Sequence, residues 1–342
     1  MRVLITGGAG YIGSVLTPML IDHGHRIRVV DAGWFGLGHV DRRAEVIEGD
    51  ILDFDRSWLD DVDAVVHLAG LSNDPMAAFS PALNYILNAT GPALAAEAAK
   101  DRGISRFIFS STCSVYGMDD SIEVTEERPT RPAFPYAISK SMAERLFTCL
   151  EDKAFRPIVL RKGTVIGWSP RMRFDLVVNS MVKTALTEGV IRINDPALWR
   201  PLIDVDDACR AYVHALDADL SIAGTFNIAG QNYQIGLLGE AVRDALAEFG
   251  ISTRLEVLNR RDPRSYRVNT DKAEQILHFR ASESIAATVR RIMNNLMDHS
   301  LTDFEDPRYY NIERLKQLMA QGAMPWFGDR VDQKDRAAVR VG

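Results

Sequence analysis

A glycine-rich stretch close to the amino terminus places the tightest constraint on the fold. Residues 6–13 read Thr-Gly-Gly-Ala-Gly-Tyr-Ile-Gly; they follow a short apolar run and precede a helix-like segment at residues 14–23. Gly7 permits a tight turn out of a strand, Gly10 removes a side chain that would block a phosphate, and Gly13 lets the helix pack closely on a sheet. Free N–H groups at the start of the helix attract anions. The stretch therefore predicts a strand–loop–helix unit that binds the pyrophosphate of a dinucleotide.

An acidic residue after the next apolar run refines the choice of dinucleotide. Residues 26–30 read as a strand and are followed by Asp31. A carboxylate at this place can accept hydrogen bonds from both ribose hydroxyls, whereas it would repel a 2′-phosphate. Residues 32–34 contain no Arg or Lys that could receive such a phosphate. We therefore expect NAD rather than NADP; the alternative is a solvated carboxylate with no ligand.

Strand and helix patterns alternate through the first half of the chain. Strands are expected in the apolar runs at residues 44–47, 64–68, 106–109 and 158–160, and the clearest helical stretches are residues 84–101 and 136–152. Such alternation predicts an α/β protein with a doubly wound parallel (Rossmann) sheet that helices cover on both faces.

The character of the sequence changes after Gly167. A loop rich in Pro and Arg is followed by a helical stretch at about residues 176–188 and a short strand at 190–193. Residues 201–229 resemble a return to the main sheet. We expect an NAD-binding domain over residues 1–167 and about 201–229, a smaller, discontinuous mixed α/β substrate lobe over 168–200 and 230–320, and a frayed tail at 330–342.

Composition excludes several classes of protein. Hydrophobic residues make up 46% of the chain and charged residues 25%, as in ordinary soluble domains. A net charge of −6 without a basic stripe argues against a nucleic-acid partner. The three cysteines are too scattered for disulfides or zinc, and the seven histidines form no metal-ligand pattern, so we expect no metal.

Two further observations concern location. The apolar amino terminus is broken by glycines that carry the motif described above, so it does not read as a signal peptide. No apolar run approaches the roughly 20 residues that span a bilayer, so no membrane partner is expected. With few and scattered cysteines, the chain suits the reducing cytoplasm.

A cluster of hydroxyl groups follows the strand expected at residues 106–109. Residues 110–117 read Ser-Ser-Thr-Cys-Ser-Val-Tyr-Gly, and Tyr136 and Lys140 follow on an expected helix. At this spacing the two side chains share a helix face, about 5–6 Å apart. An ammonium at that range stabilises a phenolate and lowers the tyrosine pKa from about 10, so that the tyrosine can act as a general base near neutral pH. A chance pairing of exposed side chains is the alternative.

In this order the motifs resemble the extended short-chain dehydrogenase/reductase family, in particular its nucleotide-sugar epimerases and dehydratases of the UDP-glucose 4-epimerase type. The resemblance covers about residues 1–297 and rests on the glycine loop, Gly49-Asp50, residues 67–70, residues 110–117 and the Tyr136/Lys140 pair. It implies a tightly bound, recycled NAD, a nucleotide-diphosphate sugar as substrate, and a homodimer formed through the two long helices, with Leu87, Leu94 and Ala98 as an apolar stripe.

The resemblance also implies roles for individual residues. The implied NAD contacts are Gly7, Gly10, Tyr11, Ile12, Gly13, Asp31, Asp50, Ile51, Leu68, Ala69, Gly70, Asn88 and Ser110. Within this set, Asp50 and Ile51 correspond to the adenine contacts. Thr112 corresponds to the family's catalytic Ser or Thr, Tyr136 to its base and acid, and Lys140 to the lysine that holds the nicotinamide ribose.

The substrate contacts match the family less closely. The implied set is Ser72, Thr112, Thr164, Asn179, Arg200 and Arg261. Thr164 stands where the family has an asparagine, which puts one sugar-nucleotide contact in question. Arginines suit a diphosphate because their planar fork matches phosphate oxygens; solvated surface arginines are the alternative.

The two residues after Thr112 bear on the reaction. A sugar-nucleotide 4,6-dehydratase needs an Asp-Glu pair there, and this chain has Cys113 and Ser114, neither a useful acid at neutral pH. We therefore expect an epimerase that transiently oxidises a sugar carbon, C4 in the first instance, and returns the hydride to the other face. The alternatives are an NAD(P)H-dependent nucleotide-4-keto-sugar reductase, then a dehydratase, and, in another class, a non-catalytic NAD-sensing protein of the same fold.

Overall fold

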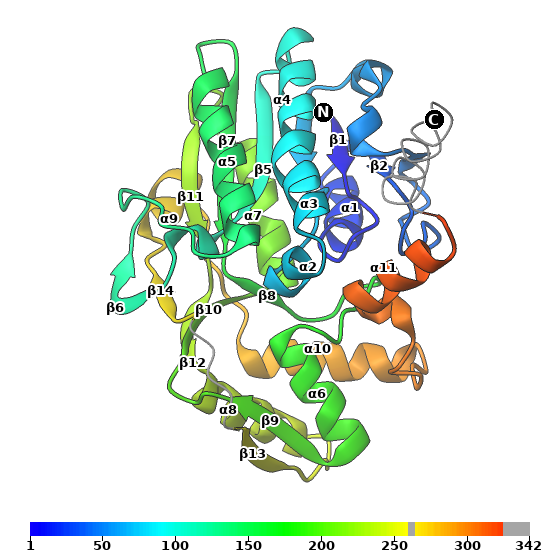
Figure 1. Cartoon of the computed structure of the whole chain (residues 1–342), viewed down its shortest axis with the longest axis vertical. Coiled ribbons are helices and arrows are strands. Elements are labelled where there is room, and N and C mark those ends of the chain that lie inside the picture. Colours follow the sequence, from blue (N-terminus) through cyan, green and yellow to red (C-terminus); the bar gives the residue numbers. More distant parts are fainter. Residues whose placement is uncertain (259–263, 324–342) are drawn as a thin grey trace, which may run out of the picture.

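A seven-stranded parallel sheet forms the centre of the computed structural model, which describes residues 1–258 and 264–323. Its strands lie in the order β11 (Gly224–Ile228), β7 (Arg156–Lys162), β5 (Arg106–Thr112), β4 (Ala64–His67), β1 (Arg2–Thr6), β2 (Arg26–Asp31) and β3 (Glu45–Glu48). Every neighbouring pair is parallel. The predicted doubly wound α/β class is confirmed (Figure 1).

Alternate residues of the central strands enter two separate cores. Val3 and Ile5 of β1 pack with helices α1 (Gly13–Asp22) and α7 (Val205–Asp217). Leu4 points the other way, toward α4 (Gly91–Asp101) and α5 (Pro135–Leu150). Because both faces are covered, the strands are apolar along their whole length, which explains the continuous apolar runs in the sequence.

The helix expected over residues 84–101 is divided. It consists of α3 (Pro81–Tyr85), a π-helical turn (Ile86–Thr90) and α4. Pro92 has no N–H to bond the carbonyl four residues earlier, which is the kind of defect that such turns accommodate. The short helix α2 (Asp74–Phe79) precedes this region.

The smaller lobe has a core of its own. Helices α6 (Val177–Glu188), α8 (Ile235–Ala247) and α10 (Ile285–Asp298) pack around the parallel pair β9 (Val190–Asn194) and β13 (Arg254–Leu258). Between the lobes lie two small sheets, one of β12 (Gln231–Gln234), β10 (Trp199–Asp204) and β8 (Thr164–Ile166), and one of β14 (Tyr266–Val268) and β6 (Asp119–Val124).

The segments of the second half of the chain that belong to the main domain differ from those predicted. Strand β10 pairs with β8 and β12 rather than with the main sheet, so the chain returns to the main domain at α7 and not at residue 201. Helices α9 (Asp271–Leu277) and α11 (Asn311–Ala320), expected in the smaller lobe, contribute to the two cores of the main domain instead. The predicted tail at 330–342 lies outside the described residues.

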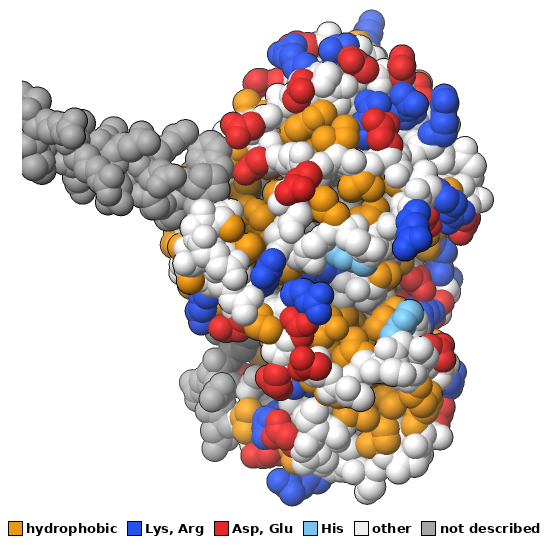
Figure 2. All heavy atoms as spheres, turned by 90° about the vertical axis from the view of Figure 1, so that its right-hand side faces the viewer, with side chains coloured by type: hydrophobic (Ala, Val, Ile, Leu, Met, Phe, Trp, Pro, Cys, Tyr) orange, Lys and Arg blue, Asp and Glu red, His pale blue; other side chains and the backbone are white. Residues whose placement is uncertain are grey.

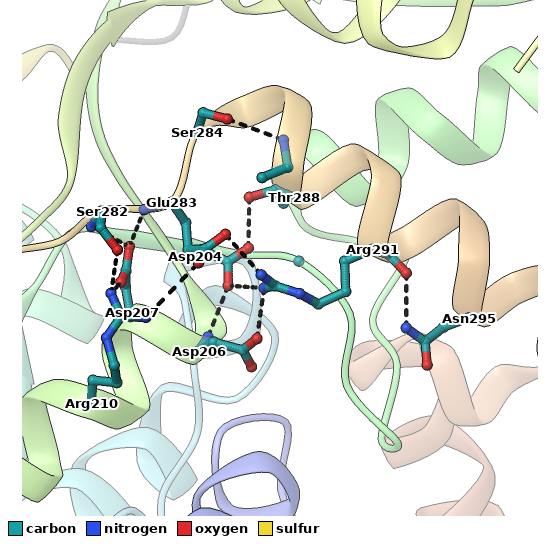
Figure 3. Close-up of polar contacts among 12 residues, drawn as sticks. Asp204, Asp206, Asp207, Arg210, Ser282, Glu283, Ser284, Thr288, Arg291 and Asn295 are labelled. Carbon is teal, nitrogen blue, oxygen red and sulfur yellow. Dashed lines mark hydrogen bonds and ion pairs between the residues drawn. The ribbon is translucent and has the colours of Figure 1, made fainter. Parts of the chain in front are cut away.

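A charged network joins the two lobes (Figure 3). Arg291 on α10 forms ion pairs with Asp204 (2.8 Å), Asp206 (2.7 Å) and Glu283 (2.7 Å). Asp204 is buried; its carboxylate also accepts hydrogen bonds from the Thr288 hydroxyl (2.6 Å) and the Asp206 N–H (2.9 Å). The start of α7, in the main domain, is thereby fixed to α10 of the smaller lobe.

The surface agrees with the charge pattern of the sequence. On the face shown in Figure 2, acidic and basic side chains are interspersed, with no continuous basic stripe. Within residues 1–258 and 264–323, no helix combines the length and apolar character needed to cross a membrane.

Candidate active site

A cavity of about 680 Å³ lies between the lobes, at the carboxyl ends of β1, β4, β5 and β7. Ligands of open parallel sheets bind at this edge. The predicted site residues that line it are Gly7, Gly10, Tyr11, Ile12, Gly13, Leu68, Gly70, Ser72, Ser110, Thr112, Tyr136, Lys140, Thr164 and Arg200. The structure thus brings together most of a set drawn from six parts of the chain.

The glycine loop at one end of the cavity fits a dinucleotide. Gly7 has a φ of +75°, and a Cβ there would stand 2.6 Å from the Ala69 backbone nitrogen. Helix α1 has no side-chain cap and no acid in its first turn, so an anion at its amino terminus meets neither a capping side chain nor a like charge. This loop and helix would hold the pyrophosphate of NAD.

Asp31 supports the loop from the adjacent strand. Its carboxylate accepts hydrogen bonds from the N–H groups of Ala9 (3.0 Å) and Gly33 (2.9 Å). Burial raises the pKa of this carboxyl, and the two hydrogen bonds oppose the rise. Asp31 ends β2 and does not line the cavity, so its contact with the adenosine ribose stays a prediction.

The expected adenine contacts are engaged within the protein. The Asp50 carboxylate accepts a hydrogen bond from the Leu52 N–H (2.9 Å), and Ile51 is buried in one of the two cores. Neither residue lines the cavity. Their role toward NAD stays a prediction.

Asn88 holds the loop after β4 by hydrogen bonds and lies outside the cavity. It is fully buried and donates hydrogen bonds to the Leu71 carbonyl (2.9 Å) and to Asn84 Oδ1 (2.8 Å). Gly70, with a φ of +143°, approaches it so closely that a Cβ would stand 2.3 Å from Asn88 Oδ1. Asn88 and Ala69 do not line the cavity, whereas Leu68 and Gly70 do. The structure therefore gives Asn88 a positioning role.

Thr112, Tyr136 and Lys140 all line the cavity. Thr112 is the last residue of β5, and its Oγ1 donates to Ser114 Oγ (3.1 Å). Tyr136 and Lys140 lie on α5, one turn apart. On the next turn of the same face, Glu144 forms a buried ion pair with Arg161 of β7 (2.6 Å) and accepts a hydrogen bond from the Ser111 hydroxyl. This pair fixes the helix to the sheet and so orients the two residues before it.

The prediction that Lys140 lowers the pKa of Tyr136 is wrong for this structure. Burial raises the pKa of Tyr136 well above its usual value and the charge of Asp74 adds to the rise, whereas Arg173 opposes it. Burial also lowers the pKa of Lys140 to about 7. Desolvation is the largest effect on the pKa of both groups.

A second buried lysine was missed in the sequence. Lys162 is the last residue of β7 and the register partner of Thr112, and it lines the cavity. Its Nζ donates to Ser110 Oγ (2.5 Å) and to the Ser111 carbonyl (2.9 Å). Burial lowers its pKa to about 7, and the nearby Lys140 adds to this. Its place at a strand end beside the hydroxyl cluster was the signal that could have revealed it.

The substrate side of the cavity is only partly as predicted. Asn179 is fully buried and does not line it, because its amide donates to the Gly167 and Arg173 carbonyls and accepts from the Gly167 N–H. These bonds make Asn179 part of the framework and remove it from the substrate contacts. Arg261 lies outside the described residues.

Several charged residues on this side were not anticipated. Arg173 is buried, pairs with Asp175 (2.8 Å) and donates to Ser72 Oγ (2.9 Å). Asp74 pairs with Arg264 (2.8 Å). Arg171 also lines the cavity. The sequence marked the Pro- and Arg-rich segment that holds Arg171 and Arg173, but gave no sign of which arginine has a partner.

The positions after Thr112 carry no acid. Cys113 is fully buried, its thiol points to the Arg161 carbonyl (3.0 Å), and burial raises its pKa. Ser114 lines the cavity and lies 3.3 Å from the Tyr266 hydroxyl. The two carboxylates in the described lining, Asp74 and Asp175, are each paired with an arginine. The part of the cavity that the structure describes therefore offers no unpaired carboxylic acid for elimination of water.

Comparison with known proteins places the chain among NAD enzymes. The model of the NAD dependent epimerase/dehydratase family matches residues 3–229. The UDP-glucose 4-epimerase of Corynebacterium glutamicum is 28% identical, over 84% of this chain and 93% of its own length.

Two solved structures share the fold. The UDP-glucuronic acid 4-epimerase of Bacillus cereus, in complex with UDP-glucuronic acid and NAD, has a TM-score of 0.78 at 24% identity over 87% of this chain and 100% of its own. The dTDP-glucose 4,6-dehydratase of Streptomyces venezuelae has a TM-score of 0.75 at 26% identity over 87% of this chain and 98% of its own. Because the fold serves both reactions, the choice between them depends on the site residues.

Proposed function

Since the chain belongs to the NAD dependent epimerase/dehydratase family, we propose that it is an NAD-dependent epimerase that inverts C4 of a nucleotide-diphosphate sugar. The observation that carries the proposal is one cavity in which Thr112, Tyr136 and Lys140 meet the glycine loop. Elimination is disfavoured because Cys113 and Ser114 replace the acids it needs. The relative from C. glutamicum, named a UDP-glucose 4-epimerase, supports C4 as the reacting carbon.

The chain's residues would hold NAD along the strand ends. The glycine loop and α1 bind the pyrophosphate, Asp31 the adenosine ribose, and Lys140 the nicotinamide ribose. When bound, NAD supplies a positively charged ring that takes up a hydride and gives it back.

Tyr136 carries the proton in this mechanism. It accepts the proton of the C4 hydroxyl as the hydride leaves C4, and the sugar becomes a 4-keto sugar. Thr112 donates a hydrogen bond to the same oxygen. After the keto sugar has turned over, Tyr136 returns the proton, and the product has the opposite configuration. Because burial favours the protonated phenol, the charge of Arg173, which lowers the pKa of Tyr136, is needed to stabilise the phenolate.

The outer part of the cavity would bind the nucleotide diphosphate. Arg200 lines it with its guanidinium 5.7 Å from the centre of the Tyr266 ring, and Arg192 and Arg264 line it as well. Ser72, on the loop that follows β4, and Thr164, the first residue of β8, also line the cavity. We place the diphosphate near Arg200 and the sugar near Ser72, Thr112 and Thr164.

Turnover of sugar nucleotides tests the function. UDP-, GDP- and dTDP-hexoses are incubated with the protein and the products are separated by chromatography. We expect a 4-epimer from one of them, and a Tyr136→Phe variant that binds NAD normally but forms none, since it cannot take the proton. Reduction of a 4-keto sugar by added NAD(P)H without epimer formation would make the protein a reductase. NAD binding without any turnover would make it a sensor.

We also propose a homodimer through the outer faces of α4 and α5. Of the predicted stripe, Leu87 and Ala98 are buried in the core, whereas Leu94 is 37% exposed and Met142 of α5 is 51% exposed. Light scattering of the purified protein measures the mass; a monomer at micromolar concentration would contradict the proposal.

A further inference from the structure

Arg171 is a buried cation without a carboxylate partner among the described residues. It is 5% exposed and lines the cavity. Its Nη2 donates to Asn311 Oδ1 (2.5 Å), its guanidinium lies 3.6 Å from the centre of the Phe35 ring, and its Nε has no hydrogen-bond partner. Burying an arginine in this way is costly unless an anion joins it.

The segment around Arg171 lies against the glycine loop. Ser169 Oγ donates to the Tyr11 carbonyl (2.7 Å) and shares a hydrogen bond with Ser14 Oγ (2.9 Å), and the Arg171 N–H donates to Ser169 Oγ (3.2 Å). Phe35 belongs to the loop that follows β2. Arg171 therefore lies between the start of α1 and the loop after Asp31.

The neighbouring arginine is neutralised, which sets Arg171 apart. Arg173 pairs with Asp175 (2.8 Å). Arg171 has only the amide of Asn311 as acceptor, and burial together with the charge of Arg173 lowers its pKa to about 9. A full positive charge at this place matches an anion that binds against the α1 amino terminus.

We propose that Arg171 binds the pyrophosphate of NAD from the side opposite α1, with its guanidinium fork held by Asn311 and Phe35. The helix dipole supplies about half a charge and Arg171 a whole one, toward a group with two negative charges. The inference rests on NAD binding and not on the epimerase reaction. The role of Arg171 can therefore be tested even if the protein epimerises no sugar.

The proposal extends to the carboxyl-terminal helix. Asn311 begins α11 and also donates to Ser72 Oγ (2.9 Å), and Arg314 on the same helix donates to the Trp34 carbonyl (2.7 Å). Helix α11 is thus tied to the loops after β2 and β4, on either side of the dinucleotide path. Contact of Arg171 with the pyrophosphate links NAD to α11, and we expect α11 to retard NAD release.

Titration calorimetry without sugar substrate tests the role of Arg171. The ligands are NAD, ADP-ribose, adenosine, NADP and UDP. Arg171→Met should weaken NAD and ADP-ribose roughly 10- to 100-fold while adenosine is unaffected, because NAD and ADP-ribose carry the pyrophosphate and adenosine does not. Asn311→Asp should also weaken NAD, since it gives Arg171 a carboxylate partner. Lys316→Met is the control, because Lys316 is exposed on α11 and bonds only Glu313 among the described residues.

Three results would overturn the assignment. Unchanged affinity of Arg171→Met for NAD and ADP-ribose is the first. A loss confined to NADP would place Arg171 at the 2′-phosphate, and a loss confined to UDP would place it in the substrate site. Release of NAD into excess competitor tests the link to α11: Asn311→Asp should speed it several-fold and Lys316→Met should not. Equal release from all three proteins would refute the link.

Discussion

Replacement of Arg291 by methionine should destabilise the protein strongly. Methionine keeps much of the volume but leaves the carboxylates of Asp204, Asp206 and Glu283 without their shared cation. Loss of one member of a buried ion pair costs about 3–5 kcal/mol. The Arg291 side chain is 29% exposed, and Asp204 keeps two hydrogen bonds, so the low end applies, about 3 kcal/mol.

The adjacent arginine provides the control. Arg290 pairs with Glu248 at 2.8 Å, with side chains 51% and 49% exposed. Exposed pairs contribute about 0–1 kcal/mol, so Arg290→Met should fall within that range. Urea unfolding followed by tryptophan fluorescence gives the free energy of unfolding of both variants and of the wild type, all measured without NAD.

The pH dependence gives a second, independent check. Burial and the neighbouring carboxylates raise the pKa of Asp206, whereas Arg291 opposes the rise. Without Arg291 the pKa of Asp206 in the folded protein lies still further above that of the unfolded chain. Such groups destabilise the fold at high pH and cease to do so as pH falls through the folded pKa. The deficit of Arg291→Met should therefore shrink between pH 7 and pH 5. A deficit no larger than that of Arg290→Met, or one that grows on acidification, would refute the reasoning.

Two further changes test the site. Burial lowers the pKa of Lys140 to about 7, far below that of an unfolded lysine, so the charged form costs stability below about pH 7 and the cost fades as pH rises toward 10. Lys140→Met should therefore raise the melting temperature more at pH 6 than at pH 9, and it should lower kcat roughly 100-fold near neutral pH. A gain in melting temperature that is independent of pH would count against a buried ammonium. Gly70→Ala places a Cβ 2.3 Å from Asn88 Oδ1 at a φ of +143° and should lower the free energy of unfolding in urea by about 2–3 kcal/mol. The control, Gly24→Ala, places a Cβ with nothing within 4 Å and should cost about 1 kcal/mol. Equal losses of stability would show that contact with Asn88 is unimportant.

Local chemistry made the core of the site predictable from sequence. The glycine loop, Asp31 and the Tyr136/Lys140 pair are each specified by a few neighbouring residues, and the structure has the expected strand–loop–helix and helix-face geometry. The parallel sheet followed from apolar runs long enough to be buried on both faces. The loop and the helix face depend on residues close in the chain, and the sheet class depends on the apolar pattern of each strand.

Properties set by distant contacts could not be predicted. Whether Tyr136 has a lowered or a raised pKa depends on its burial between the lobes, which no local spacing specifies. Asn179 was predicted to contact the substrate. Its amide instead donates to the Gly167 and Arg173 carbonyls, and these contacts form only in the folded chain. Lys162 and Arg171 became candidates once the structure showed buried cations without carboxylate partners among the described residues.

The return of α7, β11 and α11 to the main domain has a consequence for synthesis of the protein. A nascent chain that ends near Gly167 lacks the edge strand β11 and the helices that cover part of each face of the sheet. Apolar surface of β7 then stays open until α7 and β11 have been synthesised, and the core on the other face of the sheet is complete only when α11 has followed. Folding of the dinucleotide domain is therefore completed only after translation has passed residue 320, and both lobes mature together.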